Sequence, residues 1–119
     1  MSDIEVRIGK FVRLCQGWDA VSLAKPAGEA NAISDRIWGI GERLRADAVG
    51  REALEQLAVA SEFAAVRLKA AVTCLRWAPD VGVASLEQIL AGQGDRYGML
   101  PSLAFVLLAA YREGTLFAD

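Results

Sequence analysis

VRLKAAVTCLRWAP, residues 66–79, carries the clearest helical signal in the chain. Its apolar side chains recur at helical spacing, several of them are alanines, and Pro79 closes it. Small residues allow neighbouring helices to approach closely, and a proline ends one helix but suits the first turn of the next. The stretch therefore predicts one layer of a helical stack, in which Ala70, Ala71 and Leu75 are packing residues.

The composition is typical of one folded domain. The chain has 119 residues, of which 54% are hydrophobic and 24% are charged. This length is enough for one hydrophobic core but too short for two, so we expect a single domain over residues 1–119. The net charge of -2 argues against a dedicated nucleic-acid binder, because such domains are usually basic.

The two cysteines, together with the lack of a signal-peptide pattern and of a membrane-spanning pattern, indicate a cytoplasmic protein. Cys15 and Cys74 form no closely spaced pair, and the chain has no histidine, so no zinc-binding pattern is present. The N-terminus lacks an apolar signal core, and the longest apolar run, 103–111, is about half of a membrane span. We therefore expect free thiols buried in the core, a reducing compartment and no membrane contact.

Six helices are predicted, separated by glycine and proline breaks. Ser2 and Glu5 have capping-box spacing at the start of the first helix, which is expected to end within 19–24. The second helix follows a break at 25–28 and carries its apolar face within 33–44. The other helices are expected at 51–60, at 62–77, from Pro79 to the glycines in 92–94, and from Met99 to Glu113 with Gly114 as the C-cap.

No stretch has the alternating pattern of a β-strand, so the predicted fold class is all-α. The short turns between the later helices predict antiparallel helical hairpins, stacked as a short α-solenoid or a small bundle. Gly39 and Gly41 disfavour the second helix unless they permit close packing or a bend.

The opening stretch is similar to the second half of a HEAT repeat. Glu62 is followed by Arg67, then by Ala70, Ala71 and Leu75. In a HEAT repeat, an acidic residue in the turn and an arginine in the next helix bridge adjacent layers. The resemblance therefore implies that Glu62 and Arg67 form a structural interlayer pair. HEAT repeats usually have aspartate at the acidic position, where this chain has glutamate.

Most of the chain also resembles a family of small uncharacterised bacterial proteins, a domain of unknown function with a HEAT-like or armadillo-like helical-repeat fold. The residues that carry this resemblance are Asn31 with the face within 33–44, then 51–57, 66–71, Ala78 with Pro79, and Glu113 with Gly114. The resemblance implies one HEAT-like domain over 1–119. It brings no catalytic residues.

Enzymatic motifs are missing from the sequence. The commonest general base is absent because there is no histidine, and carboxylates such as Glu42 and Glu55 follow no catalytic pattern. The glycines at 39–41 and 92–94 follow no strand and lack the GK[ST] sequence of a phosphate-binding loop. We therefore predict no enzyme activity, no cofactor and no metal site.

Two tryptophans and the last helix are the candidate contact surfaces. Trp38 and Trp77 either anchor a partner, as exposed tryptophans often do, or pack under neighbouring loops. The last helix is apolar on more than one face around Val106 and Leu108, which suggests a homodimer or a tight heteromeric partner. The predicted function is a non-enzymatic protein-interaction module, such as an adaptor, a regulator or an inhibitor of the immunity-protein kind.

The alternative function is a nucleic-acid-associated helical-repeat protein with an arginine-rich face. The residues that would form this face are Arg43, Arg45, Arg51, Arg67, Lys69 and Arg76. Acidic residues are interleaved with them, which favours paired surface charges over a groove that holds phosphates.

The assignment of faces in the opening stretch predicts unequal effects of two substitutions. Ala71→Glu should unfold the domain far more readily than Arg67→Ala, because it buries a charge, whereas an exposed ion pair contributes only about 0–1 kcal/mol. Thermal unfolding followed by circular dichroism measures both variants. Comparable melting temperatures would contradict the assignment.

Overall fold

The computed structural model describes residues 2–24, 27–92 and 99–117, and it confirms the all-α fold class with six helices. No strand occurs in the described ranges. The helices are α1 (Asp3–Ala24), α2 (Ala27–Arg45), α3 (Ala48–Ala60), α4 (Ala64–Cys74), α5 (Pro79–Leu90) and α6 (Met99–Glu113).

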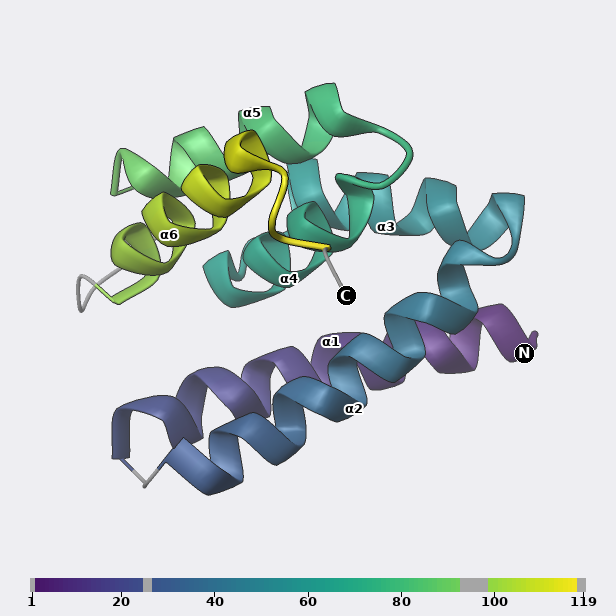
Figure 1. The fold of residues 1–119 in the computed structure, drawn as a ribbon. Helices are drawn as coiled ribbons and strands as arrows, with labels where there is room; N and C mark the ends of the chain where they lie inside the picture. The colour runs from purple at the N-terminus through teal and green to yellow at the C-terminus, as the bar shows by residue number, and fades with distance from the viewer. Residues whose placement is uncertain (1, 25–26, 93–98, 118–119) are drawn as a thin grey trace.

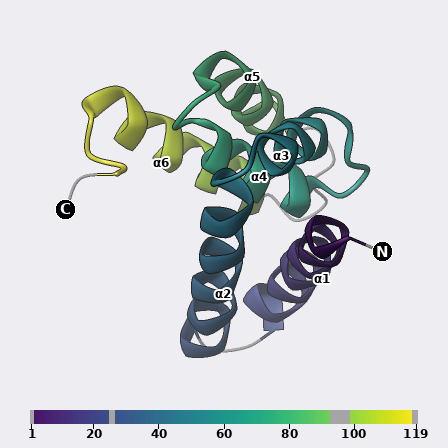
Figure 2. The ribbon, with the colours of Figure 1, turned by 90° about the vertical axis from the view of Figure 1, so that its right-hand side faces the viewer.

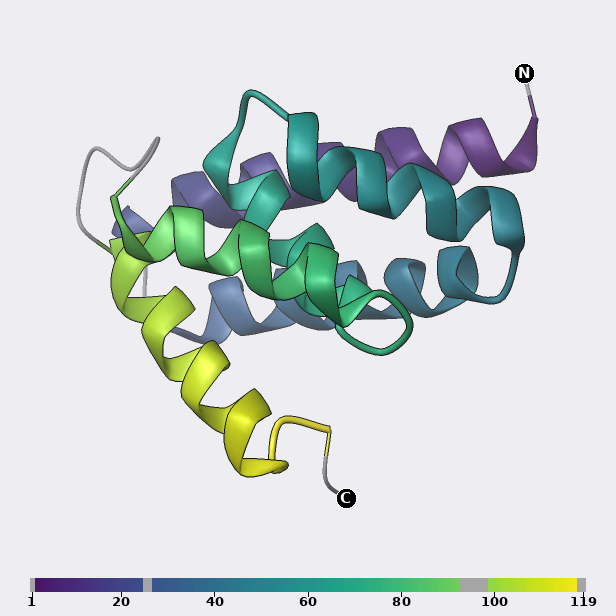
Figure 3. The ribbon, with the colours of Figure 1, turned by 90° about the horizontal axis from the view of Figure 1, so that it is seen from above.

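The helices form two layers with α4 between them. α1 and α2 make an antiparallel hairpin on one side, and α3, α5 and α6 lie on the other (Figure 1). The side view shows α1 and α2 as neighbouring rods beneath the remaining helices (Figure 2). From above, α5 runs along α3, and α6 crosses at the end of the stack (Figure 3).

The composition of α4 explains its central position. Nine of its 11 residues are buried, many of them alanines, so neighbouring helices can approach it from every side. The hydroxyl of the buried Thr73 donates a hydrogen bond to the Lys69 carbonyl oxygen at 2.9 Å, which satisfies its polar atom. The two remaining positions of α4 are Arg67 and Lys69, whose side chains leave the helix toward its edges.

The ends of α4 lie inside the predicted range of 62–77. The helix stops at Cys74 because the chain turns there: the Trp77 and Ala78 amides both donate to the Cys74 carbonyl oxygen, at 3.1 and 2.8 Å. Pro79 then occupies the first turn of α5, as predicted.

The start of α3 differs from the prediction. The helix begins at Ala48 because the Asp47 carboxylate caps it, accepting a hydrogen bond from the Val49 amide at 2.8 Å. Gly50, expected to precede the helix, lies inside it. A Cβ atom at this position would overlap the Leu44 carbonyl group, so glycine permits the tight passage from α2 to α3.

Two predicted helix caps are confirmed. Ser2 Oγ accepts a hydrogen bond from the Glu5 amide at 3.1 Å at the start of α1. Gly114 has a φ of 80°, which glycine adopts readily, and it ends α6 as expected. Of the predicted break at 25–28, residues 25–26 lie outside the described residues, and 27–28 already belong to α2. Of the predicted stop at 92–94, Gly92 is described and has a φ of 90°, and 93–94 lie outside the described residues.

Three glycines in helix interiors have different surroundings. On α2, Gly41 faces Thr73 of α4, and a Cβ atom there would lie 3.4 Å from the threonine side chain, so this glycine permits close packing. Gly39 faces open space. On α5, a Cβ atom at Gly82 would lie 2.7 Å from both the Ala71 carbonyl oxygen and the Leu75 side chain. The close approach of α4 and α5 therefore requires glycine at position 82.

Alanine substitutions at Gly82 and Gly39 should have opposite effects on stability. Gly82→Ala forces α5 away from α4 and should lower the free energy of unfolding by about 1–3 kcal/mol. Gly39→Ala meets no obstacle and should raise it by about 0.5–1 kcal/mol, because alanine favours the helix. Urea unfolding measures both. A Gly82→Ala variant as stable as the Gly39→Ala variant would contradict this packing.

Candidate functional site

Trp38 lies in a cluster that joins α2, the end of α4 and the C-terminal segment. Its side chain is 38% exposed, and its ring stacks against Phe117 with 6.0 Å between centroids. The Arg76 guanidinium carbon lies 5.1 Å from the Trp38 centroid and 4.4 Å from the Phe117 centroid. Cation–π contacts of this kind hold the segment after α6 against the helices. Trp38 is therefore partly covered by the chain's own residues.

Trp77 packs against the chain itself. It is half-buried in the turn after α4, and its Nε1 donates a hydrogen bond to Glu55 Oε2 on α3 at 3.3 Å. This contact satisfies the polar atom of the indole and ties the turn to α3. Of the two alternatives for Trp77, the structure supports packing.

Val106 and Leu108 lie on opposite sides of α6. Val106 is 61% exposed, whereas Leu108 is 1% exposed and belongs to the core. The expectation that Leu108 offers a contact surface is therefore wrong. Residues two positions apart in an α-helix, such as Val106 and Leu108, are separated by about 200° of rotation around the helix axis. The side chain that joins Val106 on the outer face is Phe105, which is 62% exposed. The spacing in the sequence shows that Val106 and Leu108 lie on different faces of α6. It does not show which of these faces is buried.

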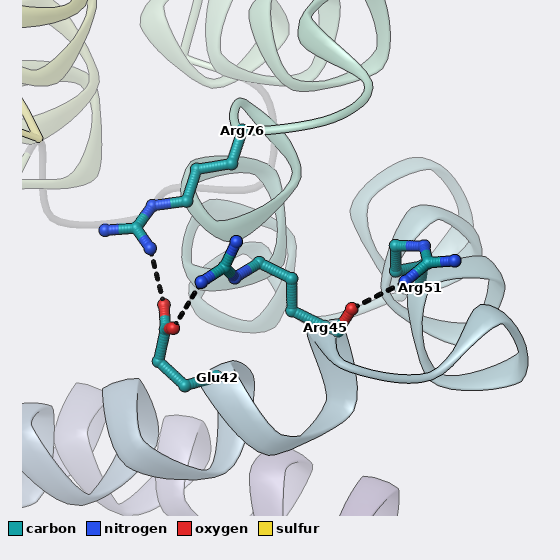
Figure 4. A network of polar contacts seen from close by, with 4 residues as sticks. All are labelled: Glu42, Arg45, Arg51 and Arg76. Atoms are coloured by element: carbon teal, nitrogen blue, oxygen red, sulfur yellow. Dashed lines mark hydrogen bonds and ion pairs between the residues drawn. The ribbon is translucent and has the colours of Figure 1, made fainter.

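Four arginines of the predicted basic face, Arg45, Arg51, Arg67 and Arg76, make internal contacts. Glu42 accepts from Arg45 Nη2 at 2.6 Å and from Arg76 Nη1 at 2.9 Å, and Arg51 Nη1 donates to the Arg45 carbonyl oxygen at 2.8 Å (Figure 4). Arg67 Nη1 donates to the Ser61 carbonyl oxygen at 2.6 Å. The Arg45–Glu42 pair lies within α2, whereas the other contacts join separate elements. These internal contacts favour paired charges over one open basic surface.

The Glu62–Arg67 pair stays a prediction. Glu62 is exposed in the short connection between α3 and α4, and Arg67 is half-buried on α4. The contact of Arg67 with the Ser61 carbonyl oxygen shows that this side chain reaches back across the connection. Arg43 lines a shallow depression between α1 and α2 together with Arg7, Lys10 and Asp3.

Lys69 makes a contact that the sequence did not reveal. Its Nζ donates a hydrogen bond to Ser34 Oγ on α2 at 3.1 Å and lies 4.1 Å from the centroid of the Trp18 ring on α1. Burial lowers the pKa of Lys69, and the neighbouring Cys15 acts weakly in the opposite direction. An ammonium group is thus held between the two layers of the fold.

A cavity of about 240 Å³ lies beside Lys69. α2 contributes Ile37 and Trp38, and α4 contributes Leu68 and Val72. The other lining residues are Ser34, Lys69, Leu107, Leu116 and Phe117. We call this space the Lys69 cavity. Its walls are apolar except for Ser34 and Lys69.

The wall formed by Leu116 and Phe117 depends on the turn at Gly114. The positive φ of Gly114 reverses the chain, and the Thr115 and Leu116 amides donate to the Ala110 carbonyl oxygen at 2.9 and 3.3 Å. The segment after α6 thereby folds back toward α4 (Figure 1). The fold thus builds the Lys69 cavity from four separate segments.

The two thiols are free and buried, as predicted. Burial raises the pKa of Cys15 to about 12, and the nearby Lys69 lowers it only slightly. Burial, with a smaller contribution from Glu55, raises the pKa of Cys74 to about 12. Both groups are therefore neutral thiols at physiological pH, unlike the thiolates that act as nucleophiles or metal ligands.

The Ser34 hydroxyl and the Lys69 ammonium form a hydrogen-bonded pair beside an apolar cavity. A serine beside a lysine of lowered pKa can act as a nucleophile only if donors stabilise the oxyanion that forms. Ser34 and Lys69 both lie within helices, where the backbone amides are already used in helical hydrogen bonds. Among the described residues, no group of three or more His, Cys, Asp or Glu side chains is placed to hold a metal ion.

No family model, curated protein or solved structure matched the chain when it was compared with each. The resemblance to HEAT-like proteins thus rests on the residues quoted above. In the ranges that the structure describes, no helix combines the length and apolar character needed to cross a membrane.

Proposed function

We propose that this chain is a non-enzymatic protein-interaction module that contacts its partner through the outward side of α6. We define the α6 outer face by the side chains that share this side of the helix: Ser102, Phe105, Val106, Ala109 and Arg112. The observation that carries the proposal is the exposure of Phe105, which at 62% is the most exposed large hydrophobic side chain in the described part of the chain.

The position of α6 supports the proposal. α6 is the last helix of the stack, and among the described helices it contacts α4 and α5 alone. Its inner side is buried through Leu100, Ala104 and Leu108. The terminal helix of a helical stack normally has a polar outer face. Two adjacent apolar side chains at this position favour a surface that another protein covers.

The surroundings of the two apolar side chains resemble those of a small interface. Phenylalanine is enriched at protein contacts, and polar groups usually surround the apolar centre. On the α6 outer face, Arg112 lies beyond Val106 and is paired with Glu87 of α5 at 3.4 Å. The partner is either a second copy of the chain or a different protein, which gives the module an adaptor, regulator or inhibitor role.

Two further features bear on the proposal. The unpaired thiols Cys15 and Cys74 support a cytoplasmic location, because thiols persist in reducing compartments. The nucleic-acid alternative receives less support, because Arg45 and Arg76 are both already paired with the Glu42 carboxylate. Phosphate binding favours cations that are not already paired.

Substitutions on α6 and α3 distinguish specific partner binding through α6 from non-specific binding to exposed apolar side chains. Val106→Asp places a charge in the proposed interface and should weaken partner binding by about 30-fold or more, the effect of losing an interface hot spot. Val59→Asp on α3 is the matched control, because Val59 and Val106 are both 61% exposed and α3 does not contact α6 among the described residues.

The measurement has two steps. Light scattering of the purified chain tests for a dimer, and affinity capture from a nuclease-treated lysate, quantified by mass spectrometry, tests for another protein. We expect one stoichiometric partner that Val106→Asp loses and Val59→Asp retains. A monomer without a stoichiometric partner, or a partner that both variants retain equally, would contradict the proposal.

A further inference from the structure

We propose that the Lys69 cavity binds a small amphipathic carboxylate, with the apolar part of the ligand in the cavity and its carboxylate against the Lys69 ammonium. This site is independent of the proposed function, since it uses neither Phe105 nor Val106. Three features of the described residues carry the inference: an unmatched charge, a second free donor and an apolar space of suitable size.

The charge on Lys69 has no anionic partner among the described residues. The ion pairs in these ranges join Arg45 and Arg76 to Glu42, and Arg112 to Glu87. The contacts of Lys69 are a neutral hydroxyl and an aromatic ring. Among the described residues, Lys69 is also the sole charged residue that lines its cavity. A charge removed from water is costly unless a counter-charge reaches it, so the site favours an anion.

The neighbouring thiol does not act as that counter-charge. Cys15 lies close enough to influence Lys69, but its raised pKa keeps it protonated and neutral near pH 7. The anion that completes the site must therefore come from outside the described residues.

Ser34 supplies the second donor. Its Oγ accepts the hydrogen bond from Lys69 Nζ at 3.1 Å, which leaves the hydroxyl proton of Ser34 without an acceptor among the described residues. The ammonium keeps two further N–H groups. One ammonium and one hydroxyl side by side match the two oxygens of a carboxylate. They are too few to satisfy a phosphate, which proteins usually hold with several donors or with arginine.

The size and lining of the cavity indicate the size and the apolar character of the part of the ligand that carries the carboxylate. A volume of about 240 Å³ is the liquid volume of about eight water molecules, so the ligand is small. Ile37, Val72 and Leu107 offer apolar surface, and Trp38 and Phe117 add aromatic rings. Binding sites for small molecules commonly combine such walls with a few polar groups that orient the ligand. A short aliphatic or aromatic carboxylic acid fits both parts of the site.

Octanoate is the probe that tests the inference, and octanol, which has the same tail and no charge, is its matched control. Isothermal titration calorimetry of the full chain should show saturable one-to-one binding of octanoate and at least about tenfold weaker binding of octanol, since a hydrogen bond to a charged group is lost. Tryptophan fluorescence should change with the same midpoint, because Trp38 lines the cavity and Trp18 contacts Lys69.

Lys69→Met tests the role of the ammonium, and Lys10→Met is its control because Lys10 is exposed on α1. Lys69→Met should lose at least about tenfold in affinity for octanoate, whereas Lys10→Met should bind like the wild type. Melting temperatures of both variants verify that they fold. Ser34→Ala gives a second test of the donor pair and should also weaken octanoate binding.

Three results would overturn the inference. The first is the absence of saturable octanoate binding to the wild-type chain. The second is equal affinity of octanoate and octanol, which would show an apolar cavity that does not recognise the charge. The third is undiminished binding of octanoate by both Lys69→Met and Ser34→Ala. If Lys69→Met does not fold, the Ser34→Ala variant and the octanol comparison decide the question.

Discussion

The burial of α4 on nearly every side is the constraint on which the rest of the structure depends. α4 contacts each of the other five helices, and nine of its 11 residues are buried. Such a helix can be surrounded only if its side chains are small and its polar atoms are satisfied. The alanines of α4 meet the first condition, and the hydrogen bond of Thr73 to the Lys69 carbonyl oxygen meets the second. The glycines that face α4, Gly41 and Gly82, extend the same close packing to α2 and α5.

Because α4 is buried on nearly every side, the contacts of its two charged residues indicate what each charge does. Arg67 reaches the Ser61 carbonyl oxygen at the connection to α3, so its charge-bearing group serves the fold. Lys69 reaches the space between α2 and α4, where its neighbours are Ser34, Trp18 and an apolar cavity. A lysine held there by packing alone is destabilising, because its charge is partly removed from water. A fold that retains such a group is often preserving a binding function at the expense of stability.

Much of the fold could be predicted from local signals in the sequence. Ser2 with Glu5, Pro79 and Gly114 mark helix ends through hydrogen bonds and backbone angles that depend on few neighbours. The small residues of α4 likewise indicated a packed helix. The helix α3 begins before the expected range of 51–60 because Asp47 caps it, and Gly50 is needed inside the helix for the close passage from α2.

The candidate sites were less predictable because they depend on contacts between distant residues. Ser34 and Lys69 are 35 positions apart, and no spacing rule brings them together. Phe117 meets Trp38 and Arg76 only because the chain reverses after Gly114. On α6, apolar residues occur on both sides of the helix, so periodicity alone could not tell that Leu108 faces inward and Phe105 outward.

Native-state hydrogen exchange of the backbone amides tests most directly the claim that α4 holds the structure together. We expect the amides of α4 to exchange slowest, with a free energy of opening equal to that of global unfolding. The amides of the α1–α2 hairpin and of α6 should open at a lower free energy. If the α4 amides exchange through local openings while the amides of α1 and α2 retain full protection, the claim that α4 holds the structure together is contradicted.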